Sequence, residues 1–191
     1  GAHNQAGELG HIIVEPNGPQ CNCGNRGCLE ALTSDNAFIR MIWPQNARNT
    51  AELSIAERKD LVRTGYELAM SGDPKASSAL ASVMRYLGIG IANAVTFYDP
   101  QRVLIAGTLI DIAPAMIIDW IRRESLQYIR AEARGVEMQS LANVDGFLMR
   151  GAIGLVLCEP FRSLNEDNMN ALSFGVPVAK RDSPKDYVPS L

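Results

Sequence analysis

Three cysteines within eight residues constrain this chain more than any other feature of its sequence. Cys21, Cys23 and Cys28 lie close together, whereas the fourth cysteine, Cys158, follows in a distant apolar segment. Cysteines one residue apart rarely meet disulfide geometry, and a secreted disulfide scaffold would be shorter and richer in cysteine. We therefore interpret the three clustered thiols as metal ligands and Cys158 as a core residue.

A nearby histidine completes a ligand set typical of zinc. Structural zinc binds four ligands in a tetrahedron, usually cysteine and histidine. The pattern His-x9-Cys-x-Cys-x4-Cys places such a set within 18 residues, from His11 to Cys28. Gly24 and Gly27 allow the tight backbone turns that this needs. The alternative is a cluster of reduced thiols under a loop; the other histidine, His3, is expected to be exposed.

Two glutamates flank these ligands closely. Glu8 precedes His11 by three residues, and Glu30 follows Cys28 by two. An imidazole can bind zinc through one nitrogen while the other contacts a ligand, and carboxylates accept hydrogen bonds from vicinal hydroxyls. We predict that zinc orients a small polyol pocket, since four protein ligands leave no open position for catalysis. Alternatively, Glu8 caps a turn and Glu30 is a solvated helix residue.

Composition excludes several classes of protein. The chain has 191 residues, of which 47% are hydrophobic and 20% charged, which is typical of one globular domain or two small ones. The net charge of −3 does not indicate a basic nucleic-acid surface. Apolar runs such as 152–158 fall short of the roughly 20 residues of a membrane span. We expect a cytoplasmic protein without a membrane partner.

Apolar spacing predicts more helix than strand. The strongest helical pattern covers 75–98, where apolar residues recur at three- and four-residue steps before Asp99-Pro100. The short apolar run 102–106 is typical of a buried strand, and the alternation of helix and strand indicates an α/β domain. Further helices are expected to begin near 27 and at 35 and to cover 54–71, 114–129 and 148–161. Short strands are expected at 12–14 and 135–139. We expect a loop at 45–53 and a surface tail or docked arm at 163–191.

Two glycines, Gly88 and Gly90, lie inside the predicted 75–98 helix. A glycine within a helix costs roughly 1 kcal/mol relative to alanine, so a compensating interaction is expected. Close packing against another element is one explanation. Approach of the backbone to a ligand or to a moving domain is the other.

The segment Glu8-Leu-Gly-His11, followed by Cys21-Asn-Cys-Gly-Asn-Arg-Gly-Cys-Leu-Glu30, resembles the signature of the ROK family of repressors, uncharacterised reading frames and sugar kinases. The similarity covers residues 1–162. It also includes Ser71-Gly-Asp73, Leu87-Gly88 with Asn93, Asp99-Pro100, Val103-Leu-Ile-Ala-Gly107 and Gly151-Ala152.

This resemblance implies the C-terminal lobe of an actin-like (ribonuclease H-like) ATPase-type α/β fold with a zinc-binding loop. It implies structural zinc bound by His11 and the three cysteines, Cys21, Cys23 and Cys28. It also implies that Glu8, His11 and Glu30 contact a sugar. Residues 1–162 would form a partial sugar-binding and oligomerisation domain, commonly dimeric or tetrameric in the family.

The chain departs from the kinases of the family in two respects. The Asp-x-Gly-Gly-Thr phosphate loop and the catalytic aspartate of the kinases would both precede Gly1, so we expect a fragment or a chain completed by another polypeptide, such as an N-terminal lobe. The turn Ala106-Gly107-Thr108-Leu109 has one glycine where kinases usually have three. It resembles the repressor branch, which includes regulators of the Mlc and N-acetylglucosamine-repressor type.

The leading hypothesis is the sugar- or sugar-phosphate-binding part of a transcriptional regulator that reaches DNA only through an N-terminal domain absent from this sequence, with no catalytic residue. The alternative is the C-terminal part of an ATP-dependent sugar kinase, similar to glucokinase, fructokinase or N-acetylglucosamine kinase. It needs an aspartate base, and Asp99, Asp111 and Asp145 are marked by no motif. A third hypothesis is a purely structural zinc module.

Overall fold

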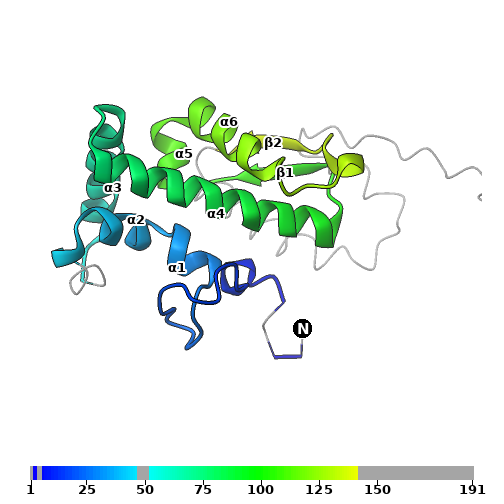
Figure 1. The fold of residues 1–191 in the computed structure, drawn as a ribbon, viewed down its shortest axis with the longest axis horizontal. Coiled ribbons are helices and arrows are strands. Elements are labelled where there is room, and N and C mark those ends of the chain that lie inside the picture. The colour runs from blue at the N-terminus through cyan, green and yellow to red at the C-terminus, as the bar shows by residue number, and fades with distance from the viewer. Residues whose placement is uncertain (1, 4–5, 47–51, 142–191) are drawn as a thin grey trace, which may run out of the picture. The chain divides into compact units, whose positions relative to one another are not determined.

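Helix α4 (Pro74–Tyr98) is the central element of the protein (Figure 1). The computed structural model describes residues 2–3, 6–46 and 52–141. Helices α1, α2, α3 and α6 all contact α4, and α5 contacts α3 and α6. The other helices are α1 (Leu29–Thr33), α2 (Asp35–Ile42), α3 (Ile55–Met70), α5 (Thr108–Ile112) and α6 (Pro114–Ser125), with 3-10 turns at Leu9–His11, Pro44–Asn46 and Ala131–Ala133.

Side-chain caps explain where three of the helices begin. The Ser34 hydroxyl accepts a hydrogen bond from the Ala37 N–H at the start of α2. Ser54 and Glu57 form a reciprocal capping box at the start of α3, and the Asp73 carboxylate caps α4. These contacts satisfy backbone N–H groups that have no partner inside the helix. The predicted helices at 35, 54–71 and 75–98 are confirmed.

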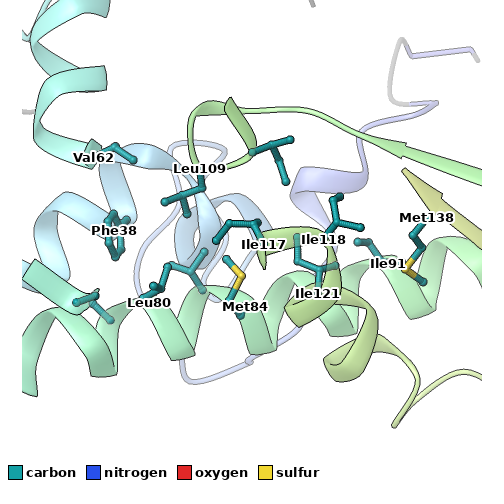
Figure 2. Close-up of a cluster of buried hydrophobic side chains, with 14 of the residues drawn as sticks. Phe38, Val62, Leu80, Met84, Ile91, Leu109, Ile117, Ile118, Ile121 and Met138 are labelled. Atoms are coloured by element: carbon teal, nitrogen blue, oxygen red, sulfur yellow. The ribbon is translucent and has the colours of Figure 1, made fainter. Parts of the chain in front are cut away.

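The main hydrophobic core contains buried side chains from α2, α3, α4, α5 and α6 (Figure 2). Although α4 is long and apolar enough to cross a membrane by length and composition alone, it contributes many of the buried side chains of this core. We therefore describe α4 as a core helix. The largest side chains in the core with less than 2% exposure are Phe38, Ile39, Val62, Leu80, Val83, Met84, Ile117 and Ile121.

Close packing accounts for both glycines inside α4. A Cβ atom at Gly88 would lie 2.5 Å from the Cβ atom of Glu124 on α6, and one at Gly90 would overlap the Leu29 side chain on α1. The packing explanation is therefore confirmed. Gly90 also brings α4 against Leu29, the residue that follows Cys28.

The sheet in the described ranges has two parallel strands, β1 (Arg102–Ile105) and β2 (Glu137–Ser140), paired from Arg102 with Glu137 to Ile105 with Ser140. The intervening α5 and α6 make the crossover that a parallel pair requires. The strand predicted at 102–106 is confirmed as β1, but its predicted burial is wrong within this part of the chain, because Leu104 is 46% exposed.

Three other predicted boundaries differ from the structure. Residues 12–14 form only an isolated bridge between Ile13 and Cys28 rather than a strand. The partner segment turns at Gly27, which has a positive φ, so the pairing ends after this bridge. The helix expected near 27 begins at Leu29, with Cys28 as its N-cap. Helix α6 ends at Ser125 rather than 129, since the chain turns there and buries the Ser125 hydroxyl against the Arg122 carbonyl.

Some predictions lie outside the described residues. These are the helix at 148–161 with Gly151-Ala152, the core position of Cys158, the tail at 163–191 and the domain boundary at 162. His3 is described and is exposed, as expected.

Candidate metal centre

The four predicted metal ligands form one cluster in the structure. One ligand atom from each of His11, Cys21, Cys23 and Cys28 lies within 4.8 Å of all the others. The Cys21 Sγ atom is 3.7 Å from His11 Nδ1, and the Cys23 and Cys28 Sγ atoms are 3.6 Å apart. Because none of the three cysteines is in a disulfide, all three sulfurs are available to an ion.

These distances fit a tetrahedral zinc ion. Zinc binds sulfur at about 2.3 Å and nitrogen at about 2.0–2.1 Å, so a regular tetrahedron separates two sulfurs by about 3.8 Å and a sulfur from a nitrogen by about 3.6 Å. The pairs Cys23–Cys28 and Cys21–His11 are within 0.2 Å of these separations. Three thiolates and one imidazole are a donor set that favours zinc over hard cations such as magnesium.

A tight turn places Cys21 and Cys23 on the same side of the loop. The Gly24 N–H donates to the Cys21 carbonyl, and the Cys21 N–H donates to the Asn25 carbonyl. Gly24 has a φ of +96°, a conformation that glycine adopts without steric cost. The turn is therefore part of the reason that two cysteines one residue apart can face a single ion.

A second glycine closes the base of the loop. The Gly27 carbonyl accepts hydrogen bonds from the N–H groups of Val14 and Glu15, and the Leu29 N–H donates to the Ile12 carbonyl. Gly27 has a φ of +67°, and a Cβ atom there would overlap the Glu15 carbonyl. Because this base joins the segment after His11 to the segment before Leu29, it brings the histidine and the last cysteine together.

The thiols of the cluster have different proton affinities. Burial, followed by the neighbouring thiols of Cys23 and Cys21, raises the pKa of Cys28 to about 12. A backbone hydrogen bond from Asn25 is the main cause that lowers the pKa of Cys23. Cys28 is fully buried and Cys21 is 5% exposed, whereas Cys23 is exposed. A metal ion that binds here must therefore displace protons, most of all from Cys28.

The two predicted sugar-binding glutamates lie against the imidazole of His11. The Glu8 carboxylate is 3.8 Å from His11 Nε2, and the Glu30 carboxylate is 3.6 Å from His11 Nδ1. Both carboxylates are about half exposed, at 54% and 49%. Glu8 precedes the 3-10 turn Leu9–His11, but its side chain makes no capping hydrogen bond. The structure thus brings Glu8, His11 and Glu30 together at a solvent-accessible edge of the cluster.

Two features beside this loop could not be predicted from the sequence. The Tyr86 hydroxyl on α4 donates to a Glu15 carboxylate oxygen at 3.3 Å, and these residues are 71 positions apart. A polar hollow beside Cys21 also includes Asn36 and Arg40 from α2. Only the packing of α2 and α4 beside the loop places these side chains there.

Comparison with known proteins extends the resemblance. The family model described as the ROK family matches residues 1–158. The xylose repressor of Bacillus spizizenii is 32% identical over 124 residues, which are 65% of this chain and 29% of that protein. The transcriptional dual regulator NagC of Escherichia coli is 38% identical over 113 residues, 57% of this chain and 27% of NagC. The Thermotoga maritima glucokinase is 32% identical over 126 residues, 64% of this chain and 39% of the enzyme.

Solved structures show the same division between enzymes and regulators. The ROK hexokinase of Thermus thermophilus superposes with a TM-score of 0.58 and 30% identity, covering 78% of this chain and 47% of the enzyme. A ROK transcriptional regulator homologous to the Escherichia coli Mlc protein gives a TM-score of 0.55 and 28% identity, covering 71% of this chain and 34% of the regulator.

These comparisons bear on the fold more than on the activity. The mixture of helices and sheet confirms the α/β prediction, and the structural neighbours are ROK proteins of the actin-like ATPase fold. The chain spans less than half the length of each of these relatives. Enzymes and regulators of this family are therefore both similar to this chain.

Proposed function

The chain belongs to the ROK family, and from this premise we propose that it is the sugar-sensing part of a transcriptional regulator with a structural zinc ion. One observation supports this proposal above all. The His11 ring presents Nδ1 to the cysteine cluster and Nε2 to the Glu8 carboxylate. A single side chain therefore connects the metal ligands to the carboxylates that would receive a sugar.

The proposed zinc ion would be held by His11, Cys21, Cys23 and Cys28. When bound, zinc supplies a rigid tetrahedral junction and no open position for a reactant. In this chain the bound zinc would hold the cysteine loop against the N-terminus of α1. Cys28 is the N-cap of α1 and Glu30 is in its first turn, so the metal would also fix the position of the Glu30 carboxylate.

The sugar would bind through its hydroxyl groups. The carboxylates of Glu8 and Glu30 accept hydrogen bonds, and the His11 nitrogen that does not face the thiols is available to a ligand. The half-exposed position of both glutamates leaves them accessible to a small molecule. Their arrangement around one imidazole suits the paired hydroxyls of a carbohydrate.

Two observations favour a regulator over a kinase. The regulator NagC, at 38% identity, is more similar to this chain than the Thermotoga maritima glucokinase, at 32%. In the turn after β1, the Thr108 hydroxyl donates to the Asp35 carboxylate at 2.7 Å, so this turn is tied to α2 by a side chain. Side chains at Thr108 and Leu109, where the kinases usually have glycines, would also hinder the close approach of a nucleotide to this turn.

A sugar kinase is the second candidate, because the Thermotoga maritima glucokinase is 32% identical to this chain. This function needs a catalytic aspartate and a phosphate cradle. Asp99 is the C-cap of α4 in a left-handed conformation, which is a helix-ending role. The kinase proposal therefore needs an aspartate other than Asp99 as its base.

As a regulator, the full protein would act in the cytoplasm as a homo-oligomer and contact DNA through a domain outside this sequence. Sugar binding at Glu8, His11 and Glu30 would favour one arrangement of the lobes or subunits over another. That change would alter the spacing of the DNA-reading elements.

Two assays on the full-length, zinc-loaded protein test this function. We expect calorimetry to detect binding of at least one of xylose, glucose and N-acetylglucosamine, and we expect that sugar to change operator binding. A coupled assay with the same sugars and ATP should detect no ADP release. Release of ADP at a rate typical of kinases would replace the regulator with the kinase.

A further inference from the structure

The three thiols of the metal cluster differ in their access to solvent. Cys23 is exposed and lies within a run of exposed residues, 22–26, in the cysteine loop. Cys28 is fully buried at the N-terminus of α1, and Cys21 is 5% exposed. Because oxidation of a thiol depends on its exposure, a dissolved oxidant reaches the Cys23 sulfur before the other two.

The Cys28 sulfur lies within reach of an oxidised Cys23. Their Sγ atoms are 3.6 Å apart, and they must approach by about 1.6 Å to form a disulfide bond. Cys28 is the N-cap of α1, whereas Cys23 precedes Gly24, where a Cβ atom would meet nothing within 4 Å. The approach therefore needs a shift of an exposed turn rather than of the core.

The other pairings within the cluster are less favourable. Cys21 and Cys23 are one residue apart, a spacing that rarely meets disulfide geometry. Cys21 and Cys28 are both buried, so neither of these sulfurs is open to a dissolved oxidant. The Cys21 sulfur also lies beside His11 Nδ1, at 3.7 Å. Exposure and spacing together favour one pair, Cys23 with Cys28.

A disulfide between Cys23 and Cys28 would remove two of the four metal ligands. The cluster would keep only His11 and Cys21, whereas structural zinc is held by four protein ligands. A sulfur in a disulfide no longer has the thiolate charge that binds a metal ion. Formation of the bond would therefore release the ion and free the loop from it.

We propose that Cys23 is an oxidation site, where a peroxide converts the zinc-bound cysteine loop into a zinc-free form with a Cys23–Cys28 disulfide. This inference rests on the zinc ion of the proposed function and does not require a sugar. It assigns different roles to two ligands of one ion. The exposed Cys23 reacts with the oxidant, and the buried Cys28 reacts with the oxidised Cys23.

The reaction transfers two electrons from the two thiolates to hydrogen peroxide. The Cys23 sulfur attacks one peroxide oxygen, so that an S–O bond forms, the O–O bond breaks and hydroxide leaves. The Cys28 sulfur then attacks the Cys23 sulfur, so that the S–S bond forms, the S–O bond breaks and a second hydroxide leaves. Two protons from the solvent convert both hydroxides to water, and zinc leaves without a change of oxidation state.

Treatment of the full-length, zinc-loaded protein with hydrogen peroxide tests the proposal. We expect stoichiometric release of zinc, measured with a chromogenic chelator, and recovery of zinc binding after reduction with dithiothreitol. Cleavage by trypsin after Arg26 leaves Cys21 and Cys23 in one peptide and Cys28 in the peptide 27–40. Mass spectrometry should find these two peptides joined, with fragment ions that place the bond at Cys23.

Two histidine variants distinguish the exposed cysteine from a buried one. Cys23→His keeps four ligands in a set that zinc accepts, and the exposed position has room for an imidazole. This variant should release zinc about 10-fold more slowly and give no joined peptides. Cys21→His is its matched variant and should still form the Cys23–Cys28 bond. Cys158→Ser, which removes the distant thiol, should release zinc as the wild type does.

The outcomes separate this inference from the proposed function. Zinc that stays bound under peroxide, or a disulfide between any other cysteines, overturns the inference alone. Equal rates of zinc release in Cys23→His and the wild type also overturn it, and if this variant binds no zinc, the position of the bond in the wild-type peptides decides instead. If the reduced wild-type protein binds no zinc, the inference and the zinc site of the proposed function fail together.

Discussion

Gly27 lies so close to Glu15 that a Cβ atom on Gly27 would overlap the Glu15 carbonyl group. The same pair is joined by a hydrogen bond from the Glu15 N–H to the Gly27 carbonyl at 3.2 Å. This contact closes the base of the cysteine loop. The conformation of the loop therefore requires a glycine at position 27, although Gly27 is not a metal ligand.

Replacement of this glycine should open the loop. We expect Gly27→Ala to lower both zinc content and the free energy of unfolding, by more than the about 1–2 kcal/mol that a left-handed conformation alone costs. Gly24→Ala is the matched control, because Gly24 also has a positive φ but a Cβ atom there meets nothing within 4 Å. Equal losses in the two variants would show that the overlap with Glu15 is unimportant. Metal analysis and denaturant unfolding measure both quantities.

Removal of a buried ligand should affect metal and stability together. In Cys28→Ser and Cys21→Ser, zinc content should fall and the protein should lose several kcal/mol of stability, since binding of a structural metal is coupled to folding. A chelator should destabilise the wild-type protein and have little effect on either variant. Full zinc content in both variants would contradict the ligand assignment.

Glu30→Gln should separate sugar binding from metal binding. The carboxylate is 3.6 Å from His11 Nδ1 but is half exposed and outside the four-ligand cluster. We expect sugar affinity to fall about 10-fold or more, because hydrogen bonds to a charged acceptor contribute about 1.5–3 kcal/mol, with zinc content unchanged. Glu67→Gln, on an exposed face of α3, is the control, and retained affinity in Glu30→Gln would remove Glu30 from the site.

The capping box at the start of α3 should make the stability of the protein depend on pH. Hydrogen bonds from the Ser54 hydroxyl and backbone lower the pKa of Glu57 below its ordinary value of 4.5. Because the folded-state pKa is the lower one, the stabilisation is present above pH 4.5 and is lost as the pH falls through the folded-state value. The stability difference between wild type and Glu57→Gln should therefore shrink between pH 6 and pH 3. A constant difference would contradict this role, and the comparison cancels any acid release of metal common to both proteins.

Local patterns in the sequence predicted much of this structure. The helix predicted over 54–71 matches α3, and the spacing from His11 to Cys28 anticipates the four-residue cluster. These features depend on residues close together in the chain, so propensity and spacing determine them.

Features that depend on distant parts of the chain were not predictable. The apolar run 12–14 did not form a strand because Gly27 turns the partner segment away after a single bridge. The exposure of Leu104 depends on which elements cover β1, which a local pattern does not contain. The placement of Arg40 and Asn36 beside the loop follows from the packing of α2, for the same reason.

The contact between Tyr86 and Glu15 should stabilise the cysteine loop from α4. Loss of this hydrogen bond in Tyr86→Phe should cost about 1 kcal/mol, and the double variant with Glu15→Ala should show that the two effects are not additive. Burial and the nearby Glu15 charge raise the pKa of Tyr86 above its ordinary value of 10.0. Because the folded state favours the neutral phenol, its stabilisation is present below pH 10 and is lost as the pH rises through the folded-state value. Urea unfolding at pH 8 and pH 11 tests both effects, and additive losses would show that the two side chains act independently.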